Sequence, residues 1–478
     1  MTEPCDLSAV EALSEIKSSA LSPVELFESC IDRIESINPV LNAIVASDLE
    51  AGHSHAQEIT RKIQRGEEVG LLGGLPTGIK DLEATAGLRT TWGSKLLENE
   101  VPEVDDFMVS AIRAHDANIF CKTNTPEFGA GGNTVNLVYG ATGNPFDASL
   151  TCAGSSGGTA VALATGMLPI ATGSDYGGSL RTPASFCGIT GFRPSPGVVP
   201  SVQSNVALSP FAVLGPMGRS VADTHLLLRA QAVHDRRDPY SNSELQIPET
   251  LESVDLSALR VAWSVDFGCC PVDGEIAALF KSRLSTFSSG FSTCDERNPV
   301  MDNVHNVFEV LRGLFFVAAH EQTLKDHRDL LGPNVIDNTE RGLAFTASQI
   351  SQAFAQQSVI YRDTLGFFKD SDVLIAPAAA VSPFPHAQRT VSHINGEEMP
   401  TYMRWLALSY VPTTAMCCSC VIPCGLDSRG LPFGIQLIGP NGSDAKVLAA
   451  AAALEAVLAG NTETARPLPD IEAIAASL

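Results

Sequence analysis

Two glycine-flanked serine clusters are the feature of this sequence that most constrains its fold. The first reads AGSSGGT over residues 153–159, and the second reads SDYGGSLR over residues 174–181. Glycine loses more backbone entropy on folding than any other residue, so glycine runs are typical of places where the backbone must approach another group closely. We therefore expect the two clusters to form one serine-based catalytic site, whose base comes from another part of the chain.

The composition excludes several classes of protein. Of the 478 residues, 44% are hydrophobic and 18% are charged, which is typical of a globular protein with a large core. The formal net charge of -23 leaves no basic face for a nucleic acid or an anionic membrane, so neither is an expected partner. The chain starts without the pattern of a secretory signal, and no uncharged apolar run reaches about 18 residues, so we expect a cytoplasmic protein.

The twelve cysteines are scattered, apart from an adjacent pair at 269–270 and a cluster within residues 417–424. The cluster lacks a paired C-x-x-C element and a nearby histidine, so we predict no metal site there. In a chain with no secretion signal, thiols are expected to be reduced and mostly buried.

Helix-like and strand-like segments alternate along the chain, which indicates an α/β protein. Ser22, Pro23 and Glu25 form a capping box, and we expect the helix that follows to end before Asn38 and Pro39. Other helices are predicted at 48–68, 156–164, 300–330 and 347–369, with a final one from a cap at Ser443 to Gly460. Strands are predicted at 117–122, 260–265, 372–377 and 431–437.

Two interpretations of the glycine-rich clusters fit poorly. A phosphate-binding loop needs Gly-Lys-Ser/Thr or G-x-G-x-x-G, and neither follows the glycines. Residues 154–158 do satisfy G-x-S-x-G, which would make Ser156 the nucleophile of an α/β-hydrolase. That motif needs a strand directly before it, whereas residues 144–149 have the composition of a loop, and it leaves the second cluster without a role.

A third interpretation uses both clusters together with Lys80. Residues 73–81 (GGLPTGIKD) place this lysine at the end of a short apolar element, where it would also fit an ordinary surface cation. If the lysine is buried, desolvation lowers its pKa and leaves it neutral, so that it can act as the base for a serine. Gly177 and Gly178 would then place backbone N–H groups against a developing oxyanion.

The residues around these groups resemble the amidase signature family. Lys80 stands in GIKD, Ser155 in GSSGG and Ser179 in GGSLR, and the 24-residue spacing of the two serines agrees with that family. Further family landmarks follow in the expected order over nearly the whole chain: KTNTPEF at 122–128, NP at 144–145, FCG at 186–188, GPM at 215–217 and GIQ at 434–436.

The resemblance implies a role for each member of a Ser-Ser-Lys triad. Ser179 would attack an amide carbonyl and form an acyl-enzyme, which water then hydrolyses. Ser155, expected to follow a cis peptide bond, would relay the proton to neutral Lys80, which returns it to the leaving amine.

The resemblance also implies supporting groups. The oxyanion hole would consist of the backbone N–H groups of Tyr176, Gly177, Gly178 and Ser179. Ser156, Asp175 and Arg181 would hold the two serine loops together. Tyr176 departs from the family pattern, which more often has a smaller or β-branched residue there.

The implied architecture is a single amidase domain over residues 1–478. Its fold class is α/β, with a central mixed sheet covered on both sides by helices. A helical segment over about residues 1–70 would pack on the catalytic core, and residues 236–255 are a connection or surface insertion. We expect no cofactor and no metal; the partners are a small-molecule amide and water, and a homodimer is left open.

The substrate pocket is expected to be lined by variable loops. Its candidate residues are Gly129, Gly131, Asn133, Tyr176, Phe315 and Phe316, together with residues 405–414. Each also fits a plain core role, and their apolar character favours an aryl or alkyl carboxamide.

Three alternatives to a free-standing amidase are open. The glutaminase subunit of tRNA-dependent amidotransferases shares the signature, but residues 325–345 do not match its basic Arg-Arg motif. A urea-type amidohydrolase acting on allophanate or biuret-like substrates is the second. A non-catalytic binding protein is the third, although the retention of Lys80, Ser155 and Ser179 together argues against it.

Overall fold

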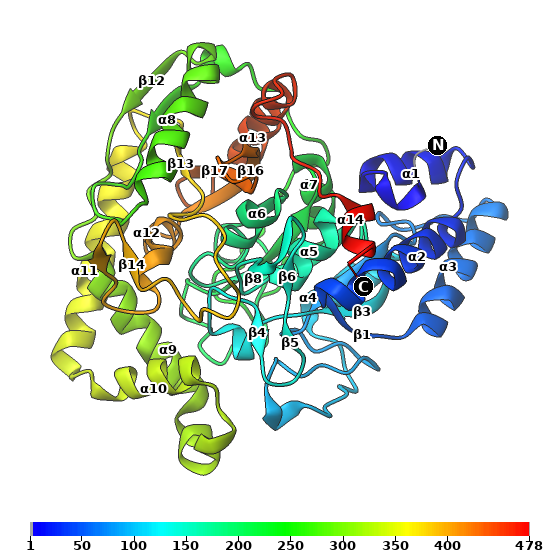
Figure 1. The fold of residues 1–478 in the computed structure, drawn as a ribbon, viewed down its shortest axis with the longest axis horizontal. Coiled ribbons are helices and arrows are strands. Elements are labelled where there is room, and N and C mark those ends of the chain that lie inside the picture. Colours follow the sequence, from blue (N-terminus) through cyan, green and yellow to red (C-terminus); the bar gives the residue numbers. More distant parts are fainter. Residues whose placement is uncertain (1–2, 478) are drawn as a thin grey trace.

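A mixed sheet of 11 strands runs through the computed structural model, which describes residues 3–477 (Figure 1). The strand order is β1-β3-β2-β8-β10-β9-β16-β17-β13-β11-β12. The bounds are β1 Ile44–Ser47, β2 Pro76–Lys80, β3 Asn118–Thr123, β8 Ile170–Asp175, β9 Thr190–Arg193, β10 Val213–Gly218, β11 Arg260–Trp263, β12 Thr293–Glu296, β13 Val373–Pro377, β16 Cys418–Leu426 and β17 Pro432–Gly439. Strand β2 is parallel to β3 and β8, and β11 is parallel to β12 and β13, while the other neighbours are antiparallel.

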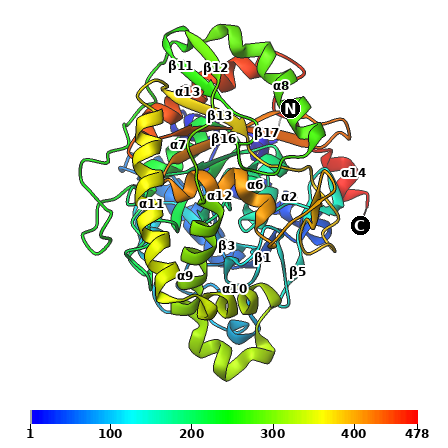
Figure 2. The ribbon, with the colours of Figure 1, turned by 90° about the vertical axis from the view of Figure 1, so that its left-hand side faces the viewer.

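Helices flank this sheet, which confirms the predicted α/β class with a central mixed sheet (Figures 1 and 2). They are α1 Ala9–Lys17, α2 Pro23–Leu41, α3 Leu49–Gln64, α4 Phe107–Ala114, α5 Gly157–Ala164, α6 Thr182–Cys187, α7 Val221–Gln231, α8 Gly274–Phe287, α9 Val304–His327, α10 Pro333–Ala344, α11 Ala347–Phe367, α12 Ala407–Thr414, α13 Asp444–Ala459 and α14 Ile471–Ala475. Within residues 3–477, each helix is too short or too polar to cross a membrane.

The N-terminal helices and the long helices α9–α11 lie at opposite ends of the molecule (Figure 1). Helix α3 packs against β3, and β1 adds an antiparallel strand to the edge of the sheet beside β3. Helix α9 packs against α10, α11 and α12. The long helix α11 runs beside α9 on the face shown in Figure 2.

Most predicted elements are present with shifted ends. Strands β3, β11, β13 and β17 confirm the four predicted strands, and helices α3, α5, α9 and α11 confirm the predicted helices at those positions. Every residue of β13 and β17 is buried, because strands in the middle of a covered sheet have apolar residues on both faces. Over residues 236–255 the structure has neither helix nor strand.

Two expectations about the helices are wrong. The capping box at Ser22 is present, but the helix passes through Pro39 and ends at Leu41, where Asn42 adopts a left-handed conformation with a φ of 52°. The buried Leu41 side chain gains packing from this extra turn, which outweighs the hydrogen bond that a proline removes. Helix α13 ends at Gly460 as predicted, but it is not the final helix, because α14 follows.

The segment before the first serine cluster is also not a loop. It forms a hairpin of β6 (Gly143–Asn144) and β7 (Asp147–Thr151), and similar two-stranded sheets join β4 (Val135–Asn136) to β5 (Gly140–Ala141) and β14 (His393–Ile394) to β15 (Glu397–Glu398). The hairpin lies outside the main sheet. The α/β-hydrolase interpretation therefore still fails, because its nucleophile must follow a strand of the central sheet.

Candidate active site

The parallel pairing of β2 with β8 brings Lys80 to the second serine cluster. Thr77 lies opposite Ile170 and Gly78 lies opposite Ala171, so both strands run in one direction and finish at the same edge of the sheet. Lys80 is the last residue of β2, and Asp175 is the last residue of β8. The carboxyl ends of parallel strands are the usual place for ligand sites in open α/β sheets.

The Lys80 side chain is fully buried and surrounded by three serine hydroxyls. Its Nζ lies 2.8 Å from Oγ of Ser155, 2.9 Å from Oγ of Ser156 and 2.9 Å from Oγ of Ser174. The first two residues come from the first serine cluster and Ser174 comes from the second. Lys80 thus joins both clusters, and the surface-cation interpretation is wrong.

Burial lowers the pKa of the Lys80 ammonium to about 8, although the nearby negative charges of Glu83 and Asp175 act in the opposite direction. Near neutral pH, an amine with this pKa exchanges readily between its charged and neutral forms. In the neutral form it can accept a proton from a hydroxyl that it contacts.

Ser155 and Ser179 approach each other through the backbone. The Gly154–Ser155 peptide bond is cis, as the resemblance implied. The N–H of Ser156 donates to the carbonyl oxygen of Ser179 at 3.3 Å, which ties the first cluster to the second. Among residues 3–477, no hydrogen bond joins the hydroxyls of Ser179 and Ser155, but both residues line the same cavity.

Helix α5 begins directly after this contact. Ser156 is its N-cap residue, and all eight helical residues are buried. The positive end of the helix dipole therefore lies at the site, where it favours negative charge.

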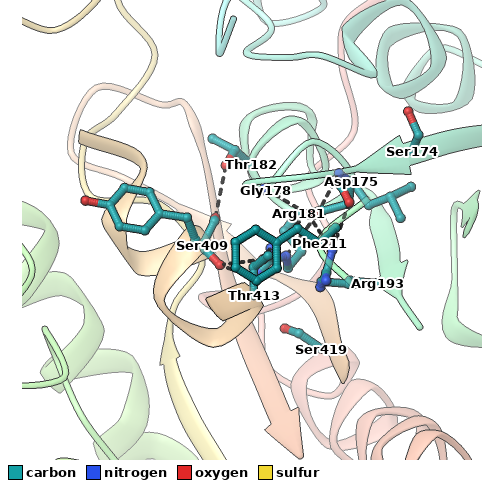
Figure 3. Close-up of polar contacts among 12 residues, drawn as sticks. Ser174, Asp175, Gly178, Arg181, Thr182, Arg193, Phe211, Ser409, Thr413 and Ser419 are labelled. Atoms are coloured by element: carbon teal, nitrogen blue, oxygen red, sulfur yellow. Dashed lines mark hydrogen bonds and ion pairs between the residues drawn. The ribbon is translucent and has the colours of Figure 1, made fainter. Parts of the chain in front are cut away.

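Asp175 is the centre of a buried ionic network (Figure 3). Its carboxylate accepts hydrogen bonds from Nε of Arg181 at 3.0 Å, from Nη2 of Arg181 at 2.9 Å and from Nη1 of Arg193 at 3.2 Å. It also accepts the N–H groups of Gly178 and Leu180. Asp175 and Arg181 thus hold the second serine loop in place.

The two arginines determine the charge of Asp175. Burial opposes ionisation of this carboxyl, but the charges of Arg181 and Arg193 outweigh it and hold its pKa well below the usual range. Arg181 also donates to the carbonyl oxygen of Ser409 at 2.7 Å and to Oγ1 of Thr413 at 2.8 Å, which anchors the loop to α12 (Figure 3).

Ser174 and Arg193 had no role assigned to them from the sequence. Both lie in the glycine-rich region: Ser174 is the second-last residue of β8, and Arg193 is the last residue of the buried strand β9. A polar side chain at the end of a buried strand is a signal by which the sequence could have identified them. Residues 405–414 were expected near the substrate. Instead, Ser409 and Thr413 contact Arg181, and none of this segment lines the cavity at Ser179.

The loop that follows β8 presents free backbone donors. Among the described residues, the N–H groups of Tyr176, Gly177 and Ser179 have no hydrogen-bond acceptor. The N–H of Gly178 is different, because it donates to Asp175 at 2.9 Å. Gly178 has a φ of +124°, and a Cβ there would lie 2.4 Å from Cβ of Ser409, so the position requires glycine.

A cavity of about 140 Å³ opens beside Ser155 and Ser179. Four of the six predicted pocket residues line it: Gly129, Tyr176, Phe315 and Phe316. Leu82, Phe128 and Arg312 complete much of the wall. The aromatic ring of Tyr176 packs against Phe315 at a centroid distance of 5.0 Å and against Phe211 at 5.7 Å, so the unusual residue of the loop shapes this wall.

The other two predicted pocket residues, Gly131 and Asn133, do not reach this cavity. Asn133 lines a separate cavity of about 280 Å³, and its side chain donates to the carbonyl oxygens of His386 and Gln388. A Cβ at Gly131 would meet Asn334. The backbone of both residues instead packs against the first serine cluster, since a Cβ at Gly154 would lie 3.2 Å from the carbonyl oxygen of Gly131 and 3.3 Å from the nitrogen of Asn133.

Ten of the twelve cysteines are buried, which confirms that the thiols are mostly buried. Those of the cluster within 417–424 lie in or next to β16. Within residues 3–477, Glu3, Cys5 and Asp6 form the one group of three side chains whose ligand atoms lie close enough together to hold a metal ion, and Arg33 pairs with both carboxylates of this group.

Similarity to known proteins agrees with this geometry. The family model described as Amidase matches residues 25–448. The chain belongs to the amidase family. It is therefore an amide-hydrolysing enzyme, and the recognition of the amidase signature in the sequence is confirmed.

Relatives of this amidase cover nearly its whole length. An acylamidase of Rhodococcus erythropolis is 33% identical, over 94% of this chain and 95% of the relative. A glutamyl-tRNA(Gln) amidotransferase subunit of Alkaliphilus metalliredigens is 29% identical, over 90% of this chain and 92% of the relative. The crystal structure of a bacterial aryl acylamidase of the amidase signature family matches with a TM-score of 0.86 and 29% identity, over 94% of this chain and 96% of that one.

The ionic network gives a testable prediction for Asp175→Asn. This substitution leaves Arg181 and Arg193 buried without a counter-charge, and breaking such a network from one side costs about 3–5 kcal/mol. We expect the free energy of unfolding, measured by urea denaturation, to fall by that amount. In the control Asp235→Asn, the lost partner is the exposed Arg237, and the unfolding midpoint should hardly change. Equal midpoints for Asp175→Asn and the wild type would contradict the role of the network.

Proposed function

We propose that this amidase cleaves a carboxylic amide through an acyl-enzyme on Ser179. Oγ of Ser179 bonds to the carbonyl carbon, and its proton passes to Ser155 as the proton of Ser155 passes to neutral Lys80. The lysine returns the proton through Ser155 to the leaving amine as the carbon–nitrogen bond breaks. Water then attacks the acyl-enzyme by the same proton route and releases the carboxylate.

One observation carries this proposal: a fully buried lysine lies 2.8 Å from a serine that shares a cavity with a second, glycine-flanked serine. Burial supplies the reason why Lys80 can start neutral. Ser156 and Ser174 position its amine, since each hydroxyl lies within 2.9 Å of Nζ.

The oxyanion hole is proposed to consist of the N–H groups of Tyr176, Gly177 and Ser179. Gly178 was also predicted as a donor, but its N–H is already held by Asp175. Its role in the proposal is to let the loop turn so that its neighbours' N–H groups face the substrate. Preorganised donors of this kind usually contribute the largest share of acyl-transfer catalysis.

The substrate is proposed to be an aryl or alkyl carboxamide. Phe128, Phe315, Phe316 and the ring of Tyr176 give the cavity apolar walls, and a relative is named acylamidase. A cytoplasmic location and assembly into a homodimer are further proposals, which rest on the sequence alone.

Substitution of the triad tests the mechanism. We expect Ser179→Ala to lower kcat by about ten-thousand-fold or more, and Lys80→Ala by several orders of magnitude, because each removes a group that acts in the reaction itself. A fluorophosphonate should label wild-type protein once, at Ser179, as located by peptide mass spectrometry. Ser348→Ala, on the exposed side of α11, should be labelled like the wild type. A wild-type protein that is not labelled at Ser179 would favour a non-catalytic binding protein.

The glutaminase subunit of an amidotransferase stays an alternative, since such subunits are 26–30% identical to this chain over most of their length. A urea-type amidohydrolase is the other. Ammonia or amine release should be measured with aryl and alkyl amides, glutamine, and ureas. We expect the aryl and alkyl amides to give the highest kcat/KM. Selective release from glutamine would support the first alternative, and selective release from a urea would support the second.

The pH dependence should reveal the neutral lysine. Because Lys80 acts in its neutral form and its pKa is about 8, kcat/KM for an uncharged amide should rise with pH through about 8 and then level off. A profile that peaks near pH 5 would contradict a lysine base.

A matched pair of variants assigns that pKa. Lys122 is also buried with a pKa lowered to about 8, and its Nζ donates to Oγ1 of Thr85 at 2.9 Å. Ser174→Ala removes an acceptor from the Lys80 ammonium, so we expect it to shift the profile to lower pH. Thr85→Val removes the corresponding acceptor from Lys122 and should leave the profile in place. A shift with Thr85→Val alone would contradict the assignment to Lys80.

A further inference from the structure

Arg312 is a buried cation in the wall of the cavity that Ser155 and Ser179 line. It belongs to α9 and is only 4% exposed. Its guanidinium lies against two aromatic rings, 5.1 Å from the centroid of Tyr176 and 4.7 Å from that of Phe316. The planar group is therefore held in one orientation beside the reactive serines.

Two neutral groups fix the guanidinium further. Nε donates to Oδ1 of Asn338 at 3.0 Å, and Nη2 donates to the hydroxyl of Tyr402 at 3.1 Å. Among the described residues, Nη1 has no acceptor, so hydrogen-bond donors are left for a ligand.

Arg312 has no counter-charge among residues 3–477. The acidic residue of the same cavity wall, Asp175, is bound to Arg181 and Arg193. The acidic residues on its other side are committed as well. Glu309 pairs with Arg404 at 3.0 Å, and Asp337 pairs with Arg341 at 3.1 Å.

A buried charge without a partner is expensive, and buried cations are normally paired with an anion. Here the vacant place for that anion is the cavity itself. We infer that Arg312 binds the carboxylate of the substrate, so that this enzyme acts on amides that also carry a carboxylate. The inference rests on the proposed function, since it assigns a substrate class to the cavity at Ser179.

The size of the cavity limits the substrate. An apolar cavity of about 150 Å³ accommodates a benzene molecule, so the 140 Å³ beside Ser179 has room for about one ring or a short alkyl chain. The apolar side chains of Leu82, Phe128 and Phe315 suit that spacer. The expected substrate therefore has one ring or a short chain between its amide and its carboxylate.

The test compares anionic amides with neutral amides of the same shape. On the acyl side, the para-nitroanilide of succinic acid is paired with that of isocaproic acid, in which an isopropyl group replaces the carboxylate. On the amine side, para-acetamidobenzoate is paired with para-isopropylacetanilide. The methyl ester of the succinyl para-nitroanilide is a further control, because it keeps a hydrogen-bond acceptor in place of the carboxylate but carries no charge. The readout is the ratio of kcat/KM for the anionic amide to that for its neutral partner.

We expect wild-type enzyme to prefer the anionic member of at least one pair. If that pair is the succinyl one, the enzyme should also prefer the charged succinyl anilide over its methyl ester. Arg312→Met should lower the preference about 10- to 100-fold, the range for a hydrogen bond to a charged group. Arg312→Lys should retain an intermediate preference, because an ammonium keeps the charge but loses the planar fork. If Arg312→Met does not fold, as judged by its thermal melt, the test rests on Arg312→Lys, whose kcat/KM ratio should be lower than that of the wild type.

The control is Arg328→Met, which removes an arginine at the end of α9 that pairs with the exposed Glu340 and does not line the cavity. Its preference should equal that of the wild type. The inference is overturned if wild-type enzyme prefers the anionic amide in neither pair, or if it prefers the succinyl side but cleaves the methyl ester as well as the acid. It is also overturned if the wild-type preference persists in Arg312→Met or is unchanged in Arg312→Lys. In any of these cases, the proposed function is still supported if wild-type enzyme cleaves a neutral anilide and Ser179→Ala does not. Failure of the Arg312 inference can therefore be distinguished from failure of the proposed function.

Discussion

The buried carboxylate of Asp175 is the interaction on which the rest of the site depends. It ends β8, forms ion pairs with both Arg181 and Arg193, and accepts hydrogen bonds from the backbone N–H groups of Gly178 and Leu180. A single ionised group thus shapes the loop that presents Ser179 and links it, through Arg181, to α12. Because its pKa is held low by two cations, this arrangement keeps its charge over the whole range of pH in which an amidase would work.

Lys80 faces the opposite electrostatic situation. Its amine is surrounded by three hydroxyls and has no carboxylate within ion-pair distance among the described residues, so burial dominates and lowers its pKa. Neighbouring parallel strands therefore end in two contrasting groups, a stabilised carboxylate and a destabilised ammonium. The first organises the loop, whereas the second is suited to exchange protons.

Tyr176 connects the reactive loop to the substrate wall. Its backbone N–H belongs to the proposed oxyanion hole, while its ring contacts Phe315 and the guanidinium of Arg312. A smaller side chain would leave Arg312 without one of the two rings that hold it. Tyr176 thus joins the loop after β8 to both the apolar wall and the cation of the cavity.

The sequence by itself determined the elements with local signals: the buried strands, the capping box at Ser22, and the two glycine-flanked serine clusters. Such signals lie within a few residues of one another, so they are readable without a fold. Only the tertiary structure decided what surrounds them. Arg312 lies more than a hundred residues from Ser179 in the chain, and Asn133 proved to line another cavity. These placements depend on how the sheet orders its strands and how α9 packs beside it, and no short-range pattern encodes either.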